Sequence, residues 1–386
     1  MSNNFQPFQL ERIMSEWEQV VEYNLSESGA HPLKLRDLLA YDDCVLDQML
    51  DTELGYGYAE GSPELREAIA QYYPGATADN VLVTLGCIEA NYIVYSTLLN
   101  PGGQVAIQVP NYLQGWGVAH NLGADRRTFR LDPDRNWALD VDSLNEAVTN
   151  DTKLIAICNP NNPTGQILTD AEIDAVIQAA DSSGAYILAD EIYAGSERVK
   201  EEVTGTIYGR FDKVLSAGSL SKSYGVPGLR IGWIVGPEDI LKEFWARHEY
   251  LTISTAKLSN HYLAPLVMRP DVRARIFERT RGYIRDGWDN FEPWIEGHKD
   301  ILSLTPPQAS AISFLRYNLK IDSVSLVERL IRDGSVLTGP GDYFGIPNHI
   351  RISYGLPHDY LMEGLNRISR VLREVAEEEG AVAAGG

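Results

Sequence analysis

The stretch "SAGSLSKSYGVPGLRIG", residues 216–232, decides the fold that this sequence predicts. It places Lys222 between two serines in a run of small residues, and Arg230 follows eight positions later. A lysine amine forms a Schiff base with an aldehyde when burial or a cationic neighbour lowers its pKa. The hydroxyls of Ser219 and Ser221 and the guanidinium of Arg230 suit a phosphate.

A single small molecule carries both groups, because an aldehyde joined to a phosphate describes pyridoxal 5′-phosphate. The alternative at this point is a tight glycine- and serine-rich loop with one solvated lysine. The two interpretations differ in what they require of the rest of the chain, since a cofactor needs further binding residues at other strand ends.

Composition limits the classes of protein to consider. The chain has 386 residues, of which 44% are hydrophobic and 23% charged, and its formal net charge is −21. The negative charge disfavours nucleic-acid binding over a broad surface. Its three cysteines are far apart, which argues against a zinc ribbon or a disulfide framework. We expect a cytoplasmic protein with no membrane partner and no metal site.

The middle of the chain alternates between two kinds of pattern. Short apolar runs bounded by turn residues predict strands, and longer runs with helical spacing predict helices. Such alternation is typical of a largely parallel sheet covered on both faces, with ligands at the carboxyl edge of the strands. The predicted strands are 104–110, 153–160, 185–190, 213–219 and 229–236, and the predicted helices are 89–99 and 169–184.

The pattern changes after about residue 275, where long polar helices precede strand-like pieces at 310–319 and 349–355. This indicates a smaller α+β domain, which the N-terminal segment is expected to join. We therefore expect a large domain over 46–275 and a small domain built from 1–45 and 276–386.

The motif "SLSKSYGVPGLRIGW" (219–233) resembles the lysine motif of fold type I pyridoxal-phosphate enzymes, the class I/II aminotransferase superfamily. The resemblance implies an α/β fold with a mostly parallel seven-stranded sheet between helices, and a smaller α+β domain. It also implies that Lys222 holds pyridoxal 5′-phosphate as an internal aldimine. The freed amine then removes the α-proton of an amino acid to give a quinonoid intermediate. Ser219, Ser221 and Arg230 would bind the phosphate.

Two further motifs resemble the family's ring-binding elements. In "ICNPNNPTG" (157–165), Asn162 would donate to the phenolic oxygen of the cofactor. In "LADEIY" (188–193), Asp190 would bind the pyridine nitrogen and favour the pyridinium, and Tyr193 would reach the same phenolic oxygen. The alternatives are a plain proline-rich turn for Asn162 and a helix cap for Asp190.

The stretch "TLGCIEAN" (84–91) resembles the phosphate cup of the family. Gly86 would let the backbone approach closely, and the amides of Cys87 and Ile88 would open a helix whose dipole favours an anion. The common pattern carries Ser or Thr where Ile88 stands, so one side-chain contact to the phosphate is expected to be missing.

Two tyrosines and an arginine complete the pattern. In "VPNYL" (109–113), Tyr112 would stack on the cofactor ring, unless it is a core tyrosine. Tyr56 would reach the phosphate of the neighbouring subunit, which implies a homodimer with shared active sites. Arg351 would hold the substrate α-carboxylate beside Asn162 by a two-pronged pair, unless it forms a structural ion pair.

The stretch "NLSESGAHPLKLRDLL" (24–39) resembles the N-terminus of capreomycidine synthase, a cyclising relative. Gly29 would lie near the substrate, and His31 would either supply a second base or cap a loop. Lys257, in "YLTISTAKLSNHY" (250–262), meets an acidic substrate group or faces solvent, and the sequence does not choose.

The leading functional hypothesis is an aminotransferase acting on an α-amino acid, with a keto acid as acceptor. The alternative is a relative that does not transaminate. Such an enzyme would be a cyclase, would eliminate or replace a group at Cβ or Cγ, or would use S-adenosylmethionine, with natural-product biosynthesis as a setting. A regulator that kept the cofactor domain without catalysis is disfavoured by the acidic charge.

Overall fold

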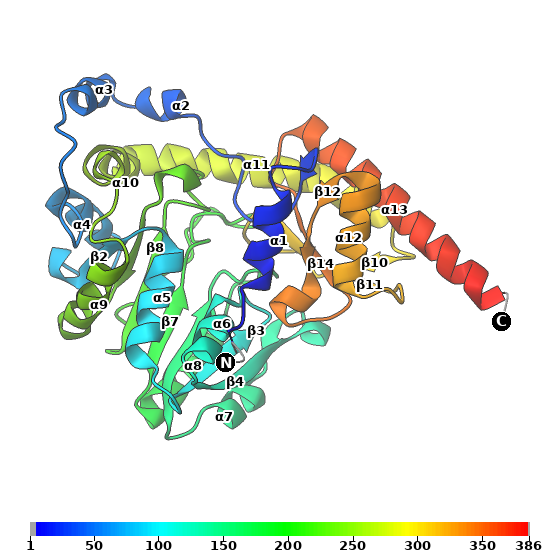
Figure 1. Ribbon diagram of the computed structural model, residues 1–386, viewed down its shortest axis with the longest axis horizontal. Helices are drawn as coiled ribbons and strands as arrows, with labels where there is room; N and C mark the ends of the chain where they lie inside the picture. Colours follow the sequence, from blue (N-terminus) through cyan, green and yellow to red (C-terminus); the bar gives the residue numbers. More distant parts are fainter. Residues whose placement is uncertain (1–4, 385–386) are drawn as a thin grey trace.

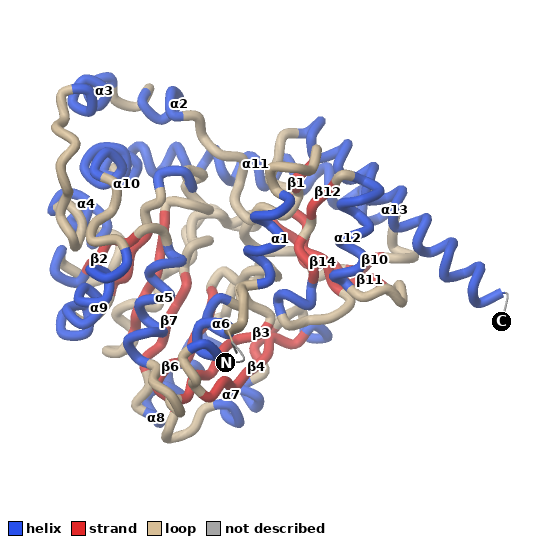
Figure 2. Tube along the Cα trace, in the orientation of Figure 1, coloured by secondary structure: helices blue, strands red, loops and turns tan. Residues whose placement is uncertain are grey.

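The computed structural model describes residues 5–384, and its largest element is an eight-stranded sheet in the order β2-β9-β8-β7-β6-β3-β4-β5 (Figures 1 and 2). Strands β4, β3, β6, β7 and β8 pair in parallel, whereas β9 runs antiparallel to its neighbours β8 and β2. The strands are β2 (Val81–Thr84), β3 (Gln104–Val109), β4 (Asp125–Asp132), β5 (Ala138–Leu139), β6 (Thr152–Cys158), β7 (Tyr186–Asp190), β8 (Val214–Ser219) and β9 (Gly232–Val235).

The mostly parallel sheet is confirmed, but it has eight strands among the described residues rather than seven. The additional strand, β5, is two residues long and pairs antiparallel with the end of β4. It forms after a tight reversal in which Asn136 adopts a left-handed conformation with φ 55°. A two-residue strand has too little sequence to show the apolar alternation by which longer strands are predicted.

Helices cover both faces of the sheet. One face packs against α5 (Cys87–Leu98), α6 (Gln114–Asn121) and α9 (Glu238–Leu251). The other packs against α7 (Val141–Ala147) and α8 (Asp170–Ser183). The predicted helix over 169–184 is α8, which begins with a capping box between Thr169 and Glu172 and ends at Gly184 in a left-handed conformation.

A second, smaller sheet lies beside the large one, with the antiparallel order β10-β11-β14-β13. The N-terminal segment joins this part, because β1 pairs in parallel with β12 through Tyr23 and Val336. Its elements are β1 (Tyr23–Asn24), β10 (Leu302–Ser303), β11 (Ile312–Tyr317), α12 (Ser323–Gly334), β12 (Val336–Leu337), β13 (Gly339–Pro340), β14 (His349–Ser353) and α13 (His358–Ala384).

The N-terminal segment does not belong to the small part throughout. Leu38 and Val45 are buried in one cluster with Leu65 and Val267 of the large part. The expected assignment of 1–45 therefore differs from the packing beyond about Leu33, and residues 1–4 and 385–386 lie outside the described range. The elements on this side are α2 (Leu35–Leu39), α3 (Asp43–Leu50), α4 (Pro63–Ala70) and α10 (Ala264–Met268).

One long helix, α11 (Pro270–Glu296), runs along both parts of the molecule (Figure 1). Near its start, the ring of Phe277 lies 4.8 Å from that of Tyr224 in the large part. Near its end, Phe291 stacks on Tyr354 of the small part at 5.5 Å. Gly287 must be glycine, because a Cβ there would lie 1.9 Å from the Tyr354 carbonyl oxygen. This helix fixes how the two parts face each other.

A short helix, α1 (Gln9–Trp17), stands where the two parts meet (Figure 1). Its residues Leu10, Ile13 and Met14 are buried, so an apolar face attaches it to the rest of the chain. Within residues 5–384, no helix combines the length and the apolar character that crossing a lipid bilayer requires.

Candidate active site

A cavity of about 220 Å³ lies at the carboxyl edge of the large sheet, below α1. Strands β2, β3, β6, β7 and β8 all end at this edge, which is where open α/β sheets bind ligands. Ten of the residues singled out in the sequence line this cavity together. They are Cys87, Ile88, Tyr112, Asn162, Asp190, Tyr193, Ser221, Lys222, Arg230 and Arg351.

Lys222 reaches the cavity from the loop after β8. Ser219, the last residue of β8, accepts a hydrogen bond from the amide of Ser221 at 3.0 Å and turns the chain toward the lysine. The Nζ of Lys222 lies 3.3 Å from Oε2 of Glu27. Gly29 lies against the same side chain, since a Cβ there would be 3.4 Å from Cδ of Lys222. The amine is therefore packed and paired, while its side chain keeps 22% exposure.

Asp190 ends β7 with its carboxylate held on both oxygens. Asn91 donates a hydrogen bond to Oδ2 at 3.1 Å, and the amide of Ile192 donates to Oδ1 at 3.2 Å. Burial raises the pKa of Asp190, and the hydrogen bond from Asn91 counters this shift. Such a carboxylate is suited to a positively charged ring nitrogen, which would stabilise its charged form.

Arg351, on β14, is 2% exposed and closes the other side of the cavity. Its Nη1 donates to Oδ1 of Asn162 at 2.9 Å, and its Nη2 donates to the Ser26 carbonyl oxygen. The Nε has no hydrogen-bond partner among the described residues. Burial lowers the pKa of the guanidinium, so a bound anion would offset a real desolvation cost.

The two aromatic residues beside the cavity are held by the N-terminal segment. The hydroxyl of Tyr193 donates to Oγ of Ser28 at 2.8 Å. The hydroxyl of Tyr112 donates to Oε1 of Glu11 on α1 at 2.6 Å, and its ring meets that of Phe8 edge-on at 4.8 Å. The N-terminal segment therefore orients both tyrosine rings.

An anion site lies at the start of α5. Gly86 precedes the helix with φ +80°, and a Cβ on it would lie 2.7 Å from Nη2 of Arg230. Gly232 packs equally close, since its Cβ would lie 2.4 Å from the amide nitrogen of Cys87. No side chain caps the helix at Gly86, so its first amides stay available. Free amides, a helix dipole and a guanidinium suit a phosphate.

These observations provide the test of whether pyridoxal 5′-phosphate fits. One cavity is surrounded by an amine, a buried carboxylate, an amide paired with a phenol, and an anion site. Each of these matches a different group of that molecule. Where Ile88 replaces the common Ser or Thr, its side chain is 38% exposed and gives no polar contact. The residues present fit the cofactor, whose phosphate the backbone amides and Arg230 would hold.

Other predicted residues lie outside the cavity. Tyr56 is 86% exposed, and its expected contact with a second subunit stays a prediction. His31 packs against the ring of Tyr283 at 5.6 Å, and its carbonyl oxygen accepts a hydrogen bond from Arg279 at 2.8 Å. Lys257 donates to the Glu53 carbonyl oxygen at 2.8 Å in a solvent-exposed hydrogen bond, and the choice between its two alternatives stays a prediction.

Sequence reasoning missed Glu27 and Asn91, which both line the cavity. Asn91 follows Cys87 by four positions on α5, so helical spacing could have placed both on one face. Glu27 lies 195 residues from Lys222, and only the fold brings them together.

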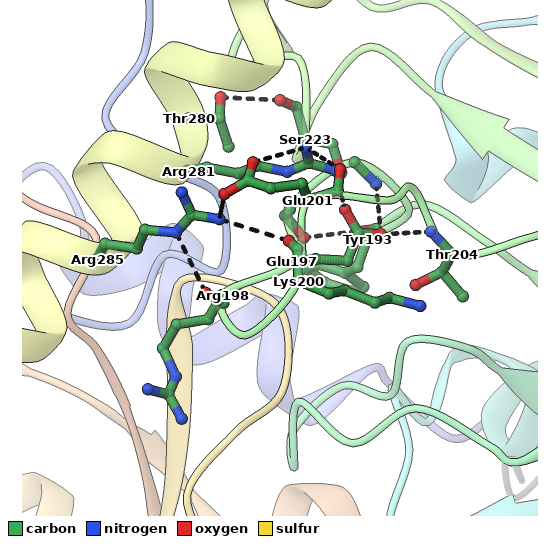
Figure 3. A network of polar contacts seen from close by, with 12 residues as sticks. Tyr193, Glu197, Arg198, Lys200, Glu201, Thr204, Ser223, Thr280, Arg281 and Arg285 are labelled. Atoms are coloured by element: carbon green, nitrogen blue, oxygen red, sulfur yellow. Dashed lines mark hydrogen bonds and ion pairs between the residues drawn. The ribbon is translucent and has the colours of Figure 1, made fainter.

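The loops that carry Lys222 and Tyr193 are tied to α11 by a polar network (Figure 3). Thr280 donates to the Ser223 carbonyl oxygen at 2.9 Å, directly after Lys222. Arg281 donates to Glu197, which is fully buried, at 2.5 Å. The other oxygen of Glu197 accepts from the amides of Gly195 at 3.0 Å and Thr204 at 2.7 Å. The helix that joins the two parts thus also fixes the cavity loops.

Comparisons with known proteins agree with this site. The chain resembles capreomycidine synthase from Streptomyces vinaceus, at 29% identity over 90% of this chain and 89% of the relative. Its structure resembles a PLP-dependent aminotransferase from Streptococcus suis, with TM-score 0.89 and 27% identity over 97% of this chain and 99% of that one. It also resembles the PLP-dependent cyclase OrfR, with TM-score 0.86 and 25% identity over 96% and 97%.

The family model for aminotransferases of class I and II matches residues 42–368, which is most of the chain. The match includes the motifs around Lys222, Asp190 and Arg351 that meet at the cavity. Fold, cofactor chemistry and family match agree on one assignment: the chain is a pyridoxal-phosphate enzyme that belongs to the aminotransferase class I and II family.

Proposed function

We propose that this enzyme transfers the amino group of an α-amino acid to a keto acid. The observation that carries the proposal is the placement of Arg351 and Lys222 on the same cavity. One supplies a buried guanidinium with an unpartnered Nε, and the other supplies an amine. A guanidinium and an amine are what binding a carboxylate and moving an α-proton require.

Substrate orientation is the first task of the site. Arg351 would bind the α-carboxylate, with Asn162 holding Nη1 at 2.9 Å so that the guanidinium plane is fixed. A substrate held at its carboxylate presents its α-proton in one direction, which is orientation acting as catalysis. Gly29 lies against the Lys222 side chain and, having no side chain of its own, leaves space there.

Proton movement is the second task. When bound, pyridoxal phosphate supplies an electron sink for the charge left at the α-carbon. Lys222 would take the α-proton as general base and deliver it to the carbon that comes from the aldehyde of the cofactor. Asp190 would place a negative charge beside the ring nitrogen, and Asn91, which donates to its Oδ2, would support that charge from α5. Tyr193, fixed by Ser28, would hold its hydroxyl toward the cofactor oxygen.

A dimer would complete the site. Tyr56 and several nearby apolar side chains are exposed in the single chain, including Leu54 at 80% and Leu50 at 73%. Contiguous exposed apolar side chains of this kind mark interaction surfaces. A second copy that covers them would bring its own Tyr56 to the phosphate.

The second candidate function is a cyclase or lyase. It is favoured by the similarity to capreomycidine synthase and to the PLP-dependent cyclase OrfR. Binding and α-proton removal by Lys222 would be the same, and loss of a group at Cβ or Cγ would follow in place of amino transfer. The cofactor-binding residues serve both reactions.

Product analysis separates the two. The purified holoenzyme is incubated with a panel of amino acids, with and without keto acids, and the products are identified by mass spectrometry. Transamination predicts a keto acid from the donor and a new amino acid from the acceptor. A product that retains the donor nitrogen, with no keto acid from any donor, would refute the aminotransferase proposal in favour of the second candidate.

A further inference from the structure

A short piece of the N-terminal segment borders the active-site cavity between two fixed contacts. The Ser26 carbonyl oxygen accepts a hydrogen bond from Nη2 of Arg351, and the hydroxyl of Ser28 accepts one from Tyr193 at 2.8 Å. Both serines are buried. Glu27 stands between them and lines the cavity. Its side chain therefore enters the site from a backbone that is held on both sides.

The carboxylate of Glu27 lies at the end of the cavity that holds the Lys222 amine. Its Oε2 is 3.3 Å from Nζ of Lys222, and among the described residues no other carboxylate forms an ion pair with that amine. Lys222 lowers the pKa of Glu27 most and Arg351 lowers it further, while burial acts against both. Glu27 is therefore charged at neutral pH and places a negative charge beside the amine.

The other carboxylates at this cavity are engaged elsewhere or lie farther from the amine. Glu11 accepts the hydroxyl of Tyr112 at 2.6 Å, and Asp190 accepts from Asn91 at 3.1 Å. Glu18 lines the cavity but forms no ion pair with Lys222 in the described part of the chain. The cationic side chains that face the same space, besides the lysine, are Arg230 and Arg351.

Four further titratable side chains face the cavity and stay neutral near pH 7. Burial raises the pKa of each of them: Cys87, Cys158, Tyr112 and Tyr193. The charge around the amine therefore comes from the carboxylates and the guanidiniums alone.

The two guanidiniums disfavour a third positive charge in the cavity, because like charges repel. Arg230 lies at the anion site before α5, where a phosphate would neutralise it. Arg351 would gain a carboxylate partner only when a substrate enters. In the loaded enzyme before substrate binds, Glu27 is thus the group placed to balance a positive charge at the Lys222 nitrogen.

We propose that Glu27 is the counter-ion of the Lys222 nitrogen and keeps this nitrogen protonated at neutral pH while the cofactor is attached to it. A protonated nitrogen withdraws electrons from the carbon to which it is bonded, and an incoming amine then attacks that carbon more readily. Glu27 acts through Lys222 and is therefore a positioning residue. The inference rests on the attachment of the cofactor to Lys222 that the proposed function assumes, and it holds for either candidate reaction.

A spectral pH titration of the holoenzyme without substrate measures the effect. The visible absorption band of the attached cofactor moves to shorter wavelength when the nitrogen loses its proton, and the midpoint of this change is determined. Without the negative charge, the proton should leave at lower pH. We expect Glu27→Gln to lower the midpoint by at least about one pH unit, because an opposite charge within about 4–6 Å shifts a titration by about 1–3 pH units.

Two further variants separate charge from packing. Glu27→Asp keeps the charge but draws it back by one methylene, so its midpoint should lie between those of the unmodified protein and Glu27→Gln. Glu18→Gln is the matched control, because it removes the same charge from the same cavity without touching the ion pair with Lys222. Its midpoint should stay close to that of the unmodified protein.

Three results would overturn the inference: an unchanged midpoint in Glu27→Gln, equal shifts in Glu27→Gln and Glu18→Gln, or equal shifts in Glu27→Gln and Glu27→Asp. If Glu27→Gln retains no cofactor, Glu27→Asp decides, since a midpoint equal to that of the unmodified protein refutes the role of the charge and a lower one supports it.

The inference and the proposed function fail in different ways. Borohydride reduction followed by mass spectrometry identifies the residue to which the cofactor is attached in each variant. Attachment at a residue other than Lys222 would overturn both. Attachment at Lys222 with a midpoint that does not respond to Glu27→Gln would refute the inference alone, and the proposed function would stand.

Discussion

Replacing Arg281 with methionine should destabilise the protein strongly, because it leaves a buried carboxylate without its cation. Arg281 lies 2.5 Å from Glu197, and the two side chains are 9% and 0% exposed. Although burial raises the pKa of Glu197, its hydrogen bonds from Gly195, Thr204 and Arg281 bring the pKa below its ordinary value. Breaking such a pair by removing one partner costs about 3–5 kcal/mol in the free energy of unfolding.

Urea unfolding followed by circular dichroism measures this cost. Arg285→Met is the matched control, since Arg285 is 38% exposed and pairs with Glu201, which is 74% exposed. An exposed pair of this kind contributes about 0–1 kcal/mol. The double variant Arg281→Met with Glu197→Gln should cost less than Arg281→Met alone, because no charge is left buried. If Arg281→Met cost no more than Arg285→Met, the reasoning about the buried pair would be refuted.

Three further predictions concern single residues. Burial raises the pKa of Glu191 to about 7, so its protonated form stabilises the fold at low pH and this contribution is lost as the pH rises through about 7. Between pH 4.5 and 8, the free energy of unfolding of Glu191→Gln, measured with urea, should therefore rise by about 3 kcal/mol relative to that of the unmodified protein. A difference between the two proteins that does not change with pH would contradict this. Lys222→Ala should lose covalent attachment of cofactor after borohydride reduction, measured by mass spectrometry; retained attachment would place the amine elsewhere. Gly86→Ala should weaken cofactor retention on dialysis at least about tenfold, since its Cβ would meet Arg230 at 2.7 Å and φ is +80°. Retention equal to the unmodified protein would contradict the close approach.

The site residues at the strand ends could be predicted because each is positioned by the strand next to it in the sequence. Asp190 ends β7, and Asn162 follows β6 by a few residues, so each is placed by its own strand. The parallel sheet then brings these ends to one edge whatever the details of packing. Most of the residues proposed for the cofactor could be found in this way.

The contacts that the N-terminal segment makes at the cavity could not be predicted from local sequence pattern. Glu27 meets Lys222, and Ser28 meets Tyr193, only after the N-terminal segment has crossed from the small part to the sheet edge. The orientation of His31 depends similarly on Arg279, 248 residues away. A short resemblance around residues 24–39 gives the kind of loop but not the direction of each side chain.

The packing of the N-terminal segment differs from the predicted domain boundary for a related reason. The strand β1 is only two residues long, and Leu38 is buried by contacts with distant parts of the chain. Which core a short apolar stretch enters is decided by the shape of the folded surfaces. Composition alone does not contain that information.

Helix α11 has a consequence for how the enzyme can evolve. Thr280 and Arg281 engage the loops of the lysine side, whereas Gly287 touches Tyr354, three residues beyond Arg351. The separation between amine and guanidinium is thus set by the pitch of one continuous helix. Inserting a single residue between 281 and 287 would rotate the second contact by about 100°. Such an insertion would change the position of Arg351 relative to Lys222, and with it the length of substrate that the two could hold between them.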